Sequence, residues 1–142
     1  MMPTSSKLSV VIAIAGIIAV LFGLLTIYSG GRALFGDEAA RGAVGNAVPF
    51  VLWFNFVAGF AYVIAGIGML MRMRWSVWLS ALIAATTVLV LLAFGAHVFF
   101  GGAYEMRTVG AMVLRCLVWI GIAVVARRMA TETAPSLLSY RR

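Results

Sequence analysis

Hydrophobic residues in this chain form four long runs, and polar residues are confined almost entirely to the segments between them. The runs cover residues 8–29, 48–71, 75–100 and 109–126. Each run is close to the ~20 residues that a helix needs to cross a hydrocarbon core of ~30 Å. The pattern predicts an all-α fold, an integral membrane four-helix bundle within residues 1–128. Residues 129–142 are polar and are expected to form a flexible cytoplasmic tail.

The first connection contains signals for helix ends. Gly30 and Gly31 are expected to end the first span, because glycine commonly terminates helices. Residues 37–41 are expected to form one helical turn. Asn46 is expected to cap the second span, with Pro49 in its first turn, where a missing N–H is harmless.

Small residues recur along one side of the first two spans. Small side chains let helix backbones approach closely in lipid. We expect these faces to pack within the bundle, with a dimer interface as the alternative. The tight connection at residues 71–74 predicts that the second and third spans form an antiparallel hairpin. The small residues are Ala15, Ala19 and Gly23 in the first span, and Ala58, Ala61, Ala65 and Gly68 in the second.

Composition supports the membrane assignment. The chain is 64% hydrophobic and 11% charged, whereas a soluble domain carries about 25% charged residues. The net charge of +7 would indicate nucleic-acid binding in a soluble protein. Here the basic residues lie at the ends of spans, so they indicate membrane orientation, and no nucleic-acid partner is expected.

The distribution of basic residues predicts that both termini are cytoplasmic. Positive charge is enriched on the cytoplasmic side of membrane proteins. With the N-terminus inside, seven basic residues are cytoplasmic and four are external. The cytoplasmic set is Lys7, Arg72, Arg74, Arg127, Arg128, Arg141 and Arg142, and the external set is Arg32, Arg41, Arg107 and Arg115.

Polar residues inside the spans are the candidates for function, because they are costly in lipid and usually face the bundle or a cavity. They gather in the external half of the membrane. The predicted ligand-binding residues are Arg115, His97, Asn55, Glu105 and Tyr28. Further polar residues inside the spans are Thr26, Tyr62, Thr86 and Thr87.

Arg115 is the most informative position. A guanidinium keeps its charge, so it needs a carboxylate, an anion, carbonyl groups or water. One interpretation is structural: Arg115 reaches the external headgroups or pairs with Glu105. The other is functional: Arg115 holds an anionic or carbonyl-bearing ligand in an outward-facing pocket.

His97 is the sole histidine and Cys116 the sole cysteine. Cys116 is expected to be a packing residue. His97 is expected to be hydrogen-bonded at an interface, with a proton or ligand contact, a metal or haem as alternatives. No metal site is predicted, because a second ligand at fixed spacing is missing. No resident cofactor is predicted, although a quinone or haem contact is kept as an alternative.

The chain resembles the DoxX-like group of small bacterial membrane proteins. The resemblance rests on a glycine-containing first span, the small-residue sequence AGFAYVIAGIGML ending in a basic turn, and His97 near the external end of the third span. It covers the whole bundle with loose motifs, and Asn55 stands where members often have an acid. The resemblance implies an inner-membrane location and association with redox or thiol-stress systems.

No catalytic constellation is present, so we do not expect an enzyme. The first hypothesis is a non-catalytic accessory or assembly subunit of a larger membrane complex, respiratory or otherwise redox. The alternatives are an oligomeric small-molecule transporter or channel, and a quinone- or small-ligand-binding protein with an external pocket. The expected partners are the lipid bilayer and either other membrane subunits or further copies of this chain.

Overall fold

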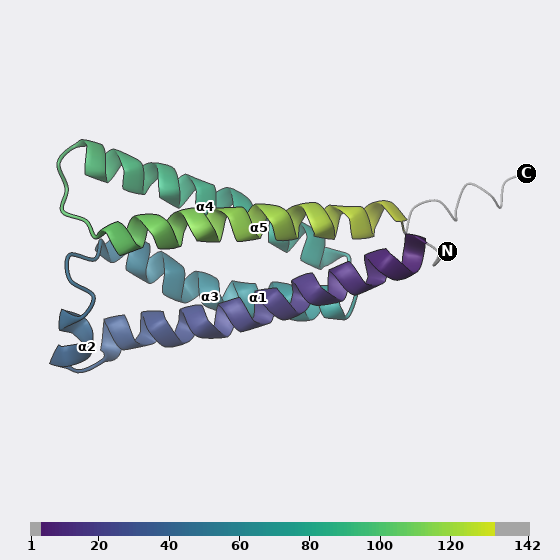
Figure 1. Ribbon diagram of the computed structural model, residues 1–142, viewed down its shortest axis with the longest axis horizontal. Coiled ribbons are helices and arrows are strands. Elements are labelled where there is room, and N and C mark those ends of the chain that lie inside the picture. The colour runs from purple at the N-terminus through teal and green to yellow at the C-terminus, as the bar shows by residue number, and fades with distance from the viewer. Residues whose placement is uncertain (1–3, 133–142) are drawn as a thin grey trace, which may run out of the picture.

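The computed structural model describes residues 4–132, and this part of the chain is helical apart from its short connections (Figure 1). Four of its helices are long and apolar enough to cross a membrane. The prediction of an all-α bundle with four potential spans is therefore confirmed. The helices are α1 (Thr4–Phe35), α2 (Glu38–Gly42), α3 (Pro49–Leu70), α4 (Trp75–Phe99) and α5 (Met106–Glu132).

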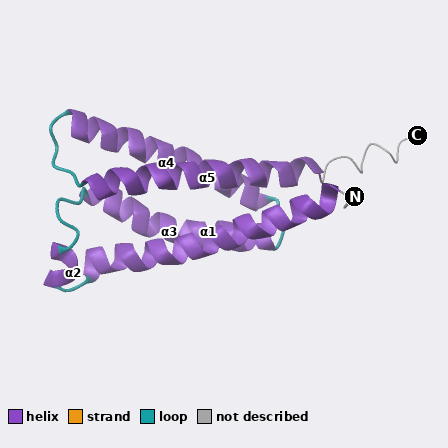
Figure 2. Cartoon of the chain, viewed as in Figure 1, coloured by secondary structure: helices purple, strands orange, loops and turns teal. Residues whose placement is uncertain are grey.

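The four long helices run alternately up and down along one axis (Figure 2). The start of α1, the α3–α4 turn and the end of α5 lie together, and we call this the terminal end. The α2 helix and the α4–α5 connection lie at the opposite end, the α2 end. A helix satisfies its backbone N–H and C=O groups by hydrogen bonds within itself. Only the backbone groups at the helix ends and in the connections therefore need other partners.

The α3–α4 turn confirms the predicted antiparallel hairpin. Arg72 adopts a left-handed backbone with φ 55°, and Met73 N–H donates to Gly68 O at 2.8 Å. This is the pattern that commonly closes a helix, with arginine in a position that usually holds glycine. The Arg72 guanidinium donates to the Ser9 hydroxyl of α1, which ties the turn to the first helix.

The predicted end of the first span at Gly30 and Gly31 is wrong, because α1 continues to Phe35. A Cβ atom at Gly30 would lie 3.2 Å from Phe56 Cβ of α3. The glycine therefore allows close packing in the middle of a helical turn and does not terminate the helix. At the other end of the bundle, α5 continues through Glu132, and residues 133–142 of the predicted tail lie outside the described residues.

The prediction of a short helix in the first connection is confirmed, and the predicted cap of the second span is wrong. Asp37 accepts a hydrogen bond from Ala40 N at 2.8 Å and caps α2. The residue that precedes α3 is Val48, which provides no side-chain cap, and Pro49 is the first residue of the helix. Asn46 lies farther back, where its backbone N–H donates to Glu105.

Helices α1 and α3 touch backbone to backbone at two glycine pairs, which we call the glycine clasp. Gly16 faces Gly66, and Gly23 faces Gly59. A Cβ atom at Gly66 would lie 2.7 Å from Gly16 O, and one at Gly23 would lie 2.8 Å from Gly59 O. The seven-residue spacing within each helix keeps both glycines on one face, and such small residues let helices associate in lipid.

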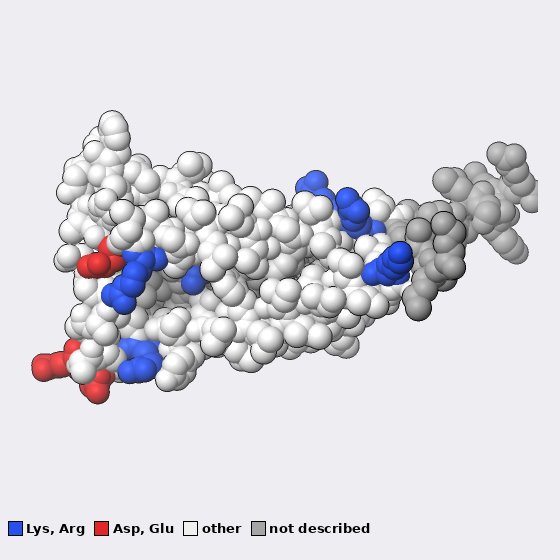
Figure 3. Space-filling model, in the orientation of Figure 1, with Lys and Arg blue, Asp and Glu red and all other residues white. Residues whose placement is uncertain are grey.

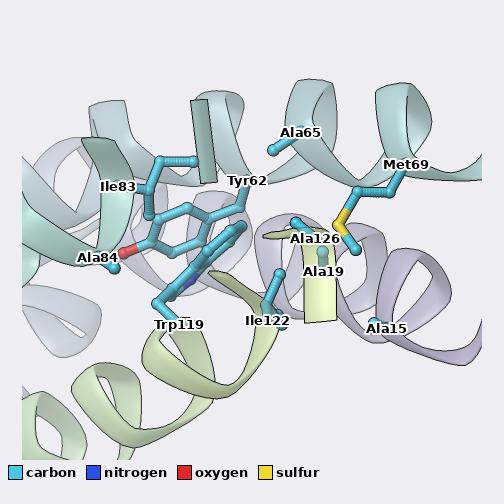
Figure 4. Close-up of a cluster of buried hydrophobic side chains, with 10 residues drawn as sticks. All are labelled: Ala15, Ala19, Tyr62, Ala65, Met69, Ile83, Ala84, Trp119, Ile122 and Ala126. Atoms are coloured by element: carbon cyan, nitrogen blue, oxygen red, sulfur yellow. The ribbon is translucent and has the colours of Figure 1, made fainter. Parts of the chain in front are cut away.

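The core lies between the clasp and the other two helices (Figure 4). Tyr62 of α3 and Trp119 of α5 are fully buried at its centre, with ring centroids 4.6 Å apart. The small-residue faces expected from the sequence contribute Ala15, Ala19 and Ala65 to this core. These faces therefore pack within the bundle, as the first of the two alternatives predicted.

We expect Gly66→Ala to destabilise the bundle by roughly 1–3 kcal/mol, because the added Cβ would press on a backbone carbonyl that cannot rotate away. The control is Gly121→Ala on α5, where a Cβ meets nothing within 4 Å. This control should be neutral or slightly stabilising, since alanine favours helix over glycine. Reversible unfolding in mixed micelles measures both. Equal stability of the two variants would contradict the clasp.

Candidate functional site

Arg115 lies well inside α5, nine positions after its first residue, or about 14 Å along the helix. Its side chain is only 8% exposed. The guanidinium lies over the Phe22 ring of α1, 5.8 Å from the centroid, and Nη1 contacts Met112 Sδ at 3.8 Å. Nε has no hydrogen-bond partner. A buried cation held by one ring face and one thioether lacks the oxygen acceptors that it needs.

The second unpartnered polar group nearby is Asn55 on α3. It lies six positions after the first residue of the helix, about 9 Å along it. Its Oδ1 is buried and accepts no hydrogen bond. Arg115, Asn55 and Glu105 line the same pocket, so three of the five predicted site residues are brought together. Arg115 offers a donor without an acceptor, and Asn55 offers an acceptor without a donor.

This pocket has a volume of about 320 Å³ and lies at the α2 end among α1, α3 and α5. Its size is typical of a site for a small molecule. Figure 3 shows acidic side chains at this end of the visible face and basic side chains at both ends. The lining residues are Thr26, Ser29, Gly30, Ala33, Ala43, Val44, Leu52, Asn55, Glu105, Arg107, Thr108, Ala111 and Arg115.

Two hydrogen bonds hold the α2–α3 connection against the start of α5 and shape the pocket. Glu105 Oε1 accepts from Asn46 N–H at 2.9 Å. Arg107 Nη2 donates to Ala43 O at 2.8 Å. The Glu105 carboxylate is thus used to hold the connection, and none of the interactions recorded for Arg115 is an ion pair with it. Glu105 therefore lines the pocket as predicted, and its carboxylate holds the α2–α3 connection in place.

His97 and Tyr28 do not line the pocket. His97 lies at the end of α4, where Nε2 is 3.2 Å from Ala103 O and the ring is edge-on to Phe50 at 6.2 Å. Its ring covers Gly102, where any Cβ would collide with it. Tyr28 is 65% exposed. His97 therefore lies between the α4–α5 connection and α3, hydrogen-bonded to Ala103, and Tyr28 lies on the outer surface of α1.

An aromatic stack in the core contacts Arg115 through Phe22, although none of its three rings lines the pocket. Tyr62 lies between Phe22 and Trp119, with centroid distances of 6.0 Å and 4.6 Å. Trp119 Nε1 is buried without a hydrogen-bond partner, and the buried Tyr62 hydroxyl lies near the Thr87 side chain. Sequence reasoning missed Trp119. Trp119 could have been identified from its position, one helical turn after Arg115 and on the same face of the helix. It is also far from the membrane interface, where tryptophan usually lies.

Several other polar residues that line the pocket were not among the predicted ligand-binding residues. Thr26 is buried, and Ser29 Oγ donates to its carbonyl at 3.3 Å. Arg107 and Thr108 add polar groups from the first turn of α5. Within residues 4–132, no three His, Cys, Asp or Glu side chains are grouped to hold a metal ion. The polar groups that line the pocket include the guanidinium of Arg115 and the amide of Asn55.

Comparison with known proteins gave no relatives: no family model, no curated protein and no solved structure matches this chain.

Removing the buried charge should stabilise the protein without ligand. We expect Arg115→Met to raise the free energy of unfolding in detergent by roughly 1–3 kcal/mol, since an apolar chain of similar length replaces an incompletely solvated cation. The control is Arg41→Met on the exposed surface of α2, which should change stability little. Thermal unfolding measures both. A less stable Arg115→Met protein would show that Arg115 is held by structural contacts alone.

Proposed function

We propose that this chain is a non-catalytic, multi-pass membrane protein that binds a small organic anion in the pocket around Arg115. The observation that supports this most is a pocket lined by the buried guanidinium of Arg115 and by Asn55, whose amide oxygen is buried, each with an unpartnered atom. Buried polar groups in proteins are hydrogen-bonded with few exceptions. Two exceptions in one pocket are well explained by a ligand that satisfies both.

The two groups define the chemistry of the ligand. Arg115 favours a carboxylate or phosphate, which a guanidinium binds through two parallel hydrogen bonds. Asn55 Oδ1 requires a hydroxyl or amine donor. A quinone carries only acceptors and would leave Asn55 unsatisfied. We therefore favour a hydroxy or amino acid anion, or a hydroxyl-bearing phosphate ester, over a quinone.

The core next to the pocket favours binding over conduction. The Phe22–Tyr62–Trp119 stack contacts Arg115 through Phe22, and the core beyond it is built largely from small and aliphatic side chains. An ion crossing this region would meet no Asp, Glu, Lys, Arg or His side chain in the described core cluster. A channel through the monomer is thus disfavoured, and a receptor-like or carrier-subunit role fits the geometry better.

An accessory role in a larger membrane complex is the second proposal. It is supported by large apolar side chains on the outside of the bundle, among them Trp78, Phe99 and Phe100, each more than 80% exposed. Lipid covers such side chains equally well, so this support is weaker than that of the pocket. The likeness to DoxX-like proteins, with its bacterial inner-membrane location and redox partners, rests on the sequence motifs.

We also propose that the terminal end is cytoplasmic and that the pocket faces outward. The described part of the terminal end carries Lys7, Arg72, Arg74, Arg127 and Arg128, and basic residues are enriched on the cytoplasmic side. An outward pocket would meet ligands from outside the cell.

Binding should require both functional groups of the ligand. We expect malate or glycerol 3-phosphate to bind protein in lipid nanodiscs, while acetate and propane-1,2-diol bind at least tenfold more weakly. Arg115→Gln should weaken the binding about tenfold to hundredfold, because it removes a charge-assisted pair. Isothermal titration calorimetry measures these affinities.

The matched control is Arg41→Gln, which removes an arginine at the same end of the bundle but outside the pocket. It should bind as tightly as wild type. Unchanged affinity in Arg115→Gln would rule out the proposed site. Equal losses in both variants would show a general charge effect and not a site.

Orientation is testable with single cysteines in a Cys116→Ala background. We expect Ala39→Cys, in α2, to react with a membrane-impermeant maleimide in intact cells, because it is exposed at the external end. Met73→Cys, in the exposed α3–α4 turn, should react only after permeabilisation. The reverse pattern would place the pocket on the cytoplasmic side.

A further inference from the structure

A second cavity lies at the terminal end, opposite to the ligand pocket. It has a volume of about 450 Å³ and lies between the start of α4 and the end of α5. Two of its lining residues are arginines that come from different helices. The lining residues are Arg74, Val77, Trp78, Ala81, Arg127 and Ala130.

The cavity is amphipathic along the helix axis. Arg74 precedes α4, and Val77, Trp78 and Ala81 follow it on one face of the helix, over about 10 Å of rise. Charge is therefore concentrated at the rim, and apolar surface continues into the membrane-spanning part. The Trp78 side chain is 81% exposed in the bundle, so its ring is free to contact an acyl chain.

The two arginines are available for a ligand. Arg72, their neighbour in the turn, donates to Ser9. Among the residues that the structure describes, Arg74 and Arg127 make no such side-chain interaction. Arg128 is adjacent in sequence to Arg127 but does not line the cavity. The convergence on one cavity, and not the basic character of this end, distinguishes the pair from other surface arginines.

We propose that this cavity is a binding site for an anionic phospholipid. The guanidinium groups of Arg74 and Arg127 bind the headgroup phosphate, and the first part of an acyl chain lies against Trp78 and Ala81. Guanidinium groups suit phosphate oxygens, and basic cavities between membrane helices on the cytoplasmic side bind anionic headgroups. The apolar lining below the rim can contact the hydrocarbon chain of a phospholipid. A free phosphate ion would make no use of this apolar surface.

The site also fits the architecture of the bundle. Its two helices are joined only at the α2 end, through the α4–α5 connection. Within the described residues, no connecting segment joins them at the terminal end. A lipid phosphate that binds one arginine from each helix would link them there, as the chain itself does at the other end.

Native mass spectrometry of the full-length protein tests the proposal. The protein is released from nanodiscs that contain equal amounts of phosphatidylglycerol and phosphatidylcholine, and retained lipids are counted. We expect wild type to retain phosphatidylglycerol preferentially. The double variant Arg74→Gln and Arg127→Gln should reduce that retention about tenfold or more, since the loss of even one charge-assisted contact weakens binding by a factor of about ten.

Arg128→Gln is the matched control, because it removes the same charge from the same end of α5 without touching the cavity. Its retention of phosphatidylglycerol should equal that of wild type. A second variant, Trp78→Ser, separates lipid from free phosphate: it should weaken phosphatidylglycerol retention while leaving both arginines in place. Thermal unfolding of each variant in detergent reports whether the bundle is intact.

Three outcomes would overturn the proposal. Equal retention of the two lipids by wild type would remove any headgroup preference. Equal losses in Arg128→Gln and in the double variant would show diffuse charge attraction. Displacement of phosphatidylglycerol by millimolar inorganic phosphate, with no effect of Trp78→Ser, would assign the arginines to a free anion.

Discussion

The contact on which this bundle depends is the glycine clasp between α1 and α3. Lipid removes most of the hydrophobic driving force between helices, so association depends on how closely the surfaces fit. With Gly16 facing Gly66 and Gly23 facing Gly59, backbone atoms of the two helices touch. The other two helices pack against this pair through larger side chains. In Figure 1, α1 and α5 diverge toward the α2 end, where the pocket that Arg115 lines is located.

That divergence explains why a charged residue can be accommodated in the spans. Arg115 extends from α5 toward α1 at the level where the helices separate, and it contacts a ring face of Phe22 where an oxygen would be the usual partner. The arrangement is costly without a ligand, because a buried cation needs acceptors. Such a loss of stability is commonly found where a protein forms a binding site, which is the role that we propose for this pocket.

The sequence by itself determined the class of fold and the residue at the centre of the site. Runs of about 20 apolar residues have few structural solutions in lipid, because every backbone polar group must be satisfied within the segment. The same physics singled out Arg115, since its charge cannot be lost and no acid lies in any span. Asn55 was predicted from its depth in the second span, and Glu105 from its place among the external acids that could pair with Arg115. These inferences needed only the solvent and the covalent chemistry of the residues.

The tertiary structure decided which faces meet. A helix that is apolar on every side gives little sign of its rotation, so sequence could not show that His97 and Tyr28 lie outside the pocket that Asn55 and Arg115 share. Glycine was ambiguous for a related reason: it ends helices and also allows close packing, and only the neighbour Phe56 shows that Gly30 serves packing. Side-chain partners across helices depend on rotation and separation, which packing alone sets.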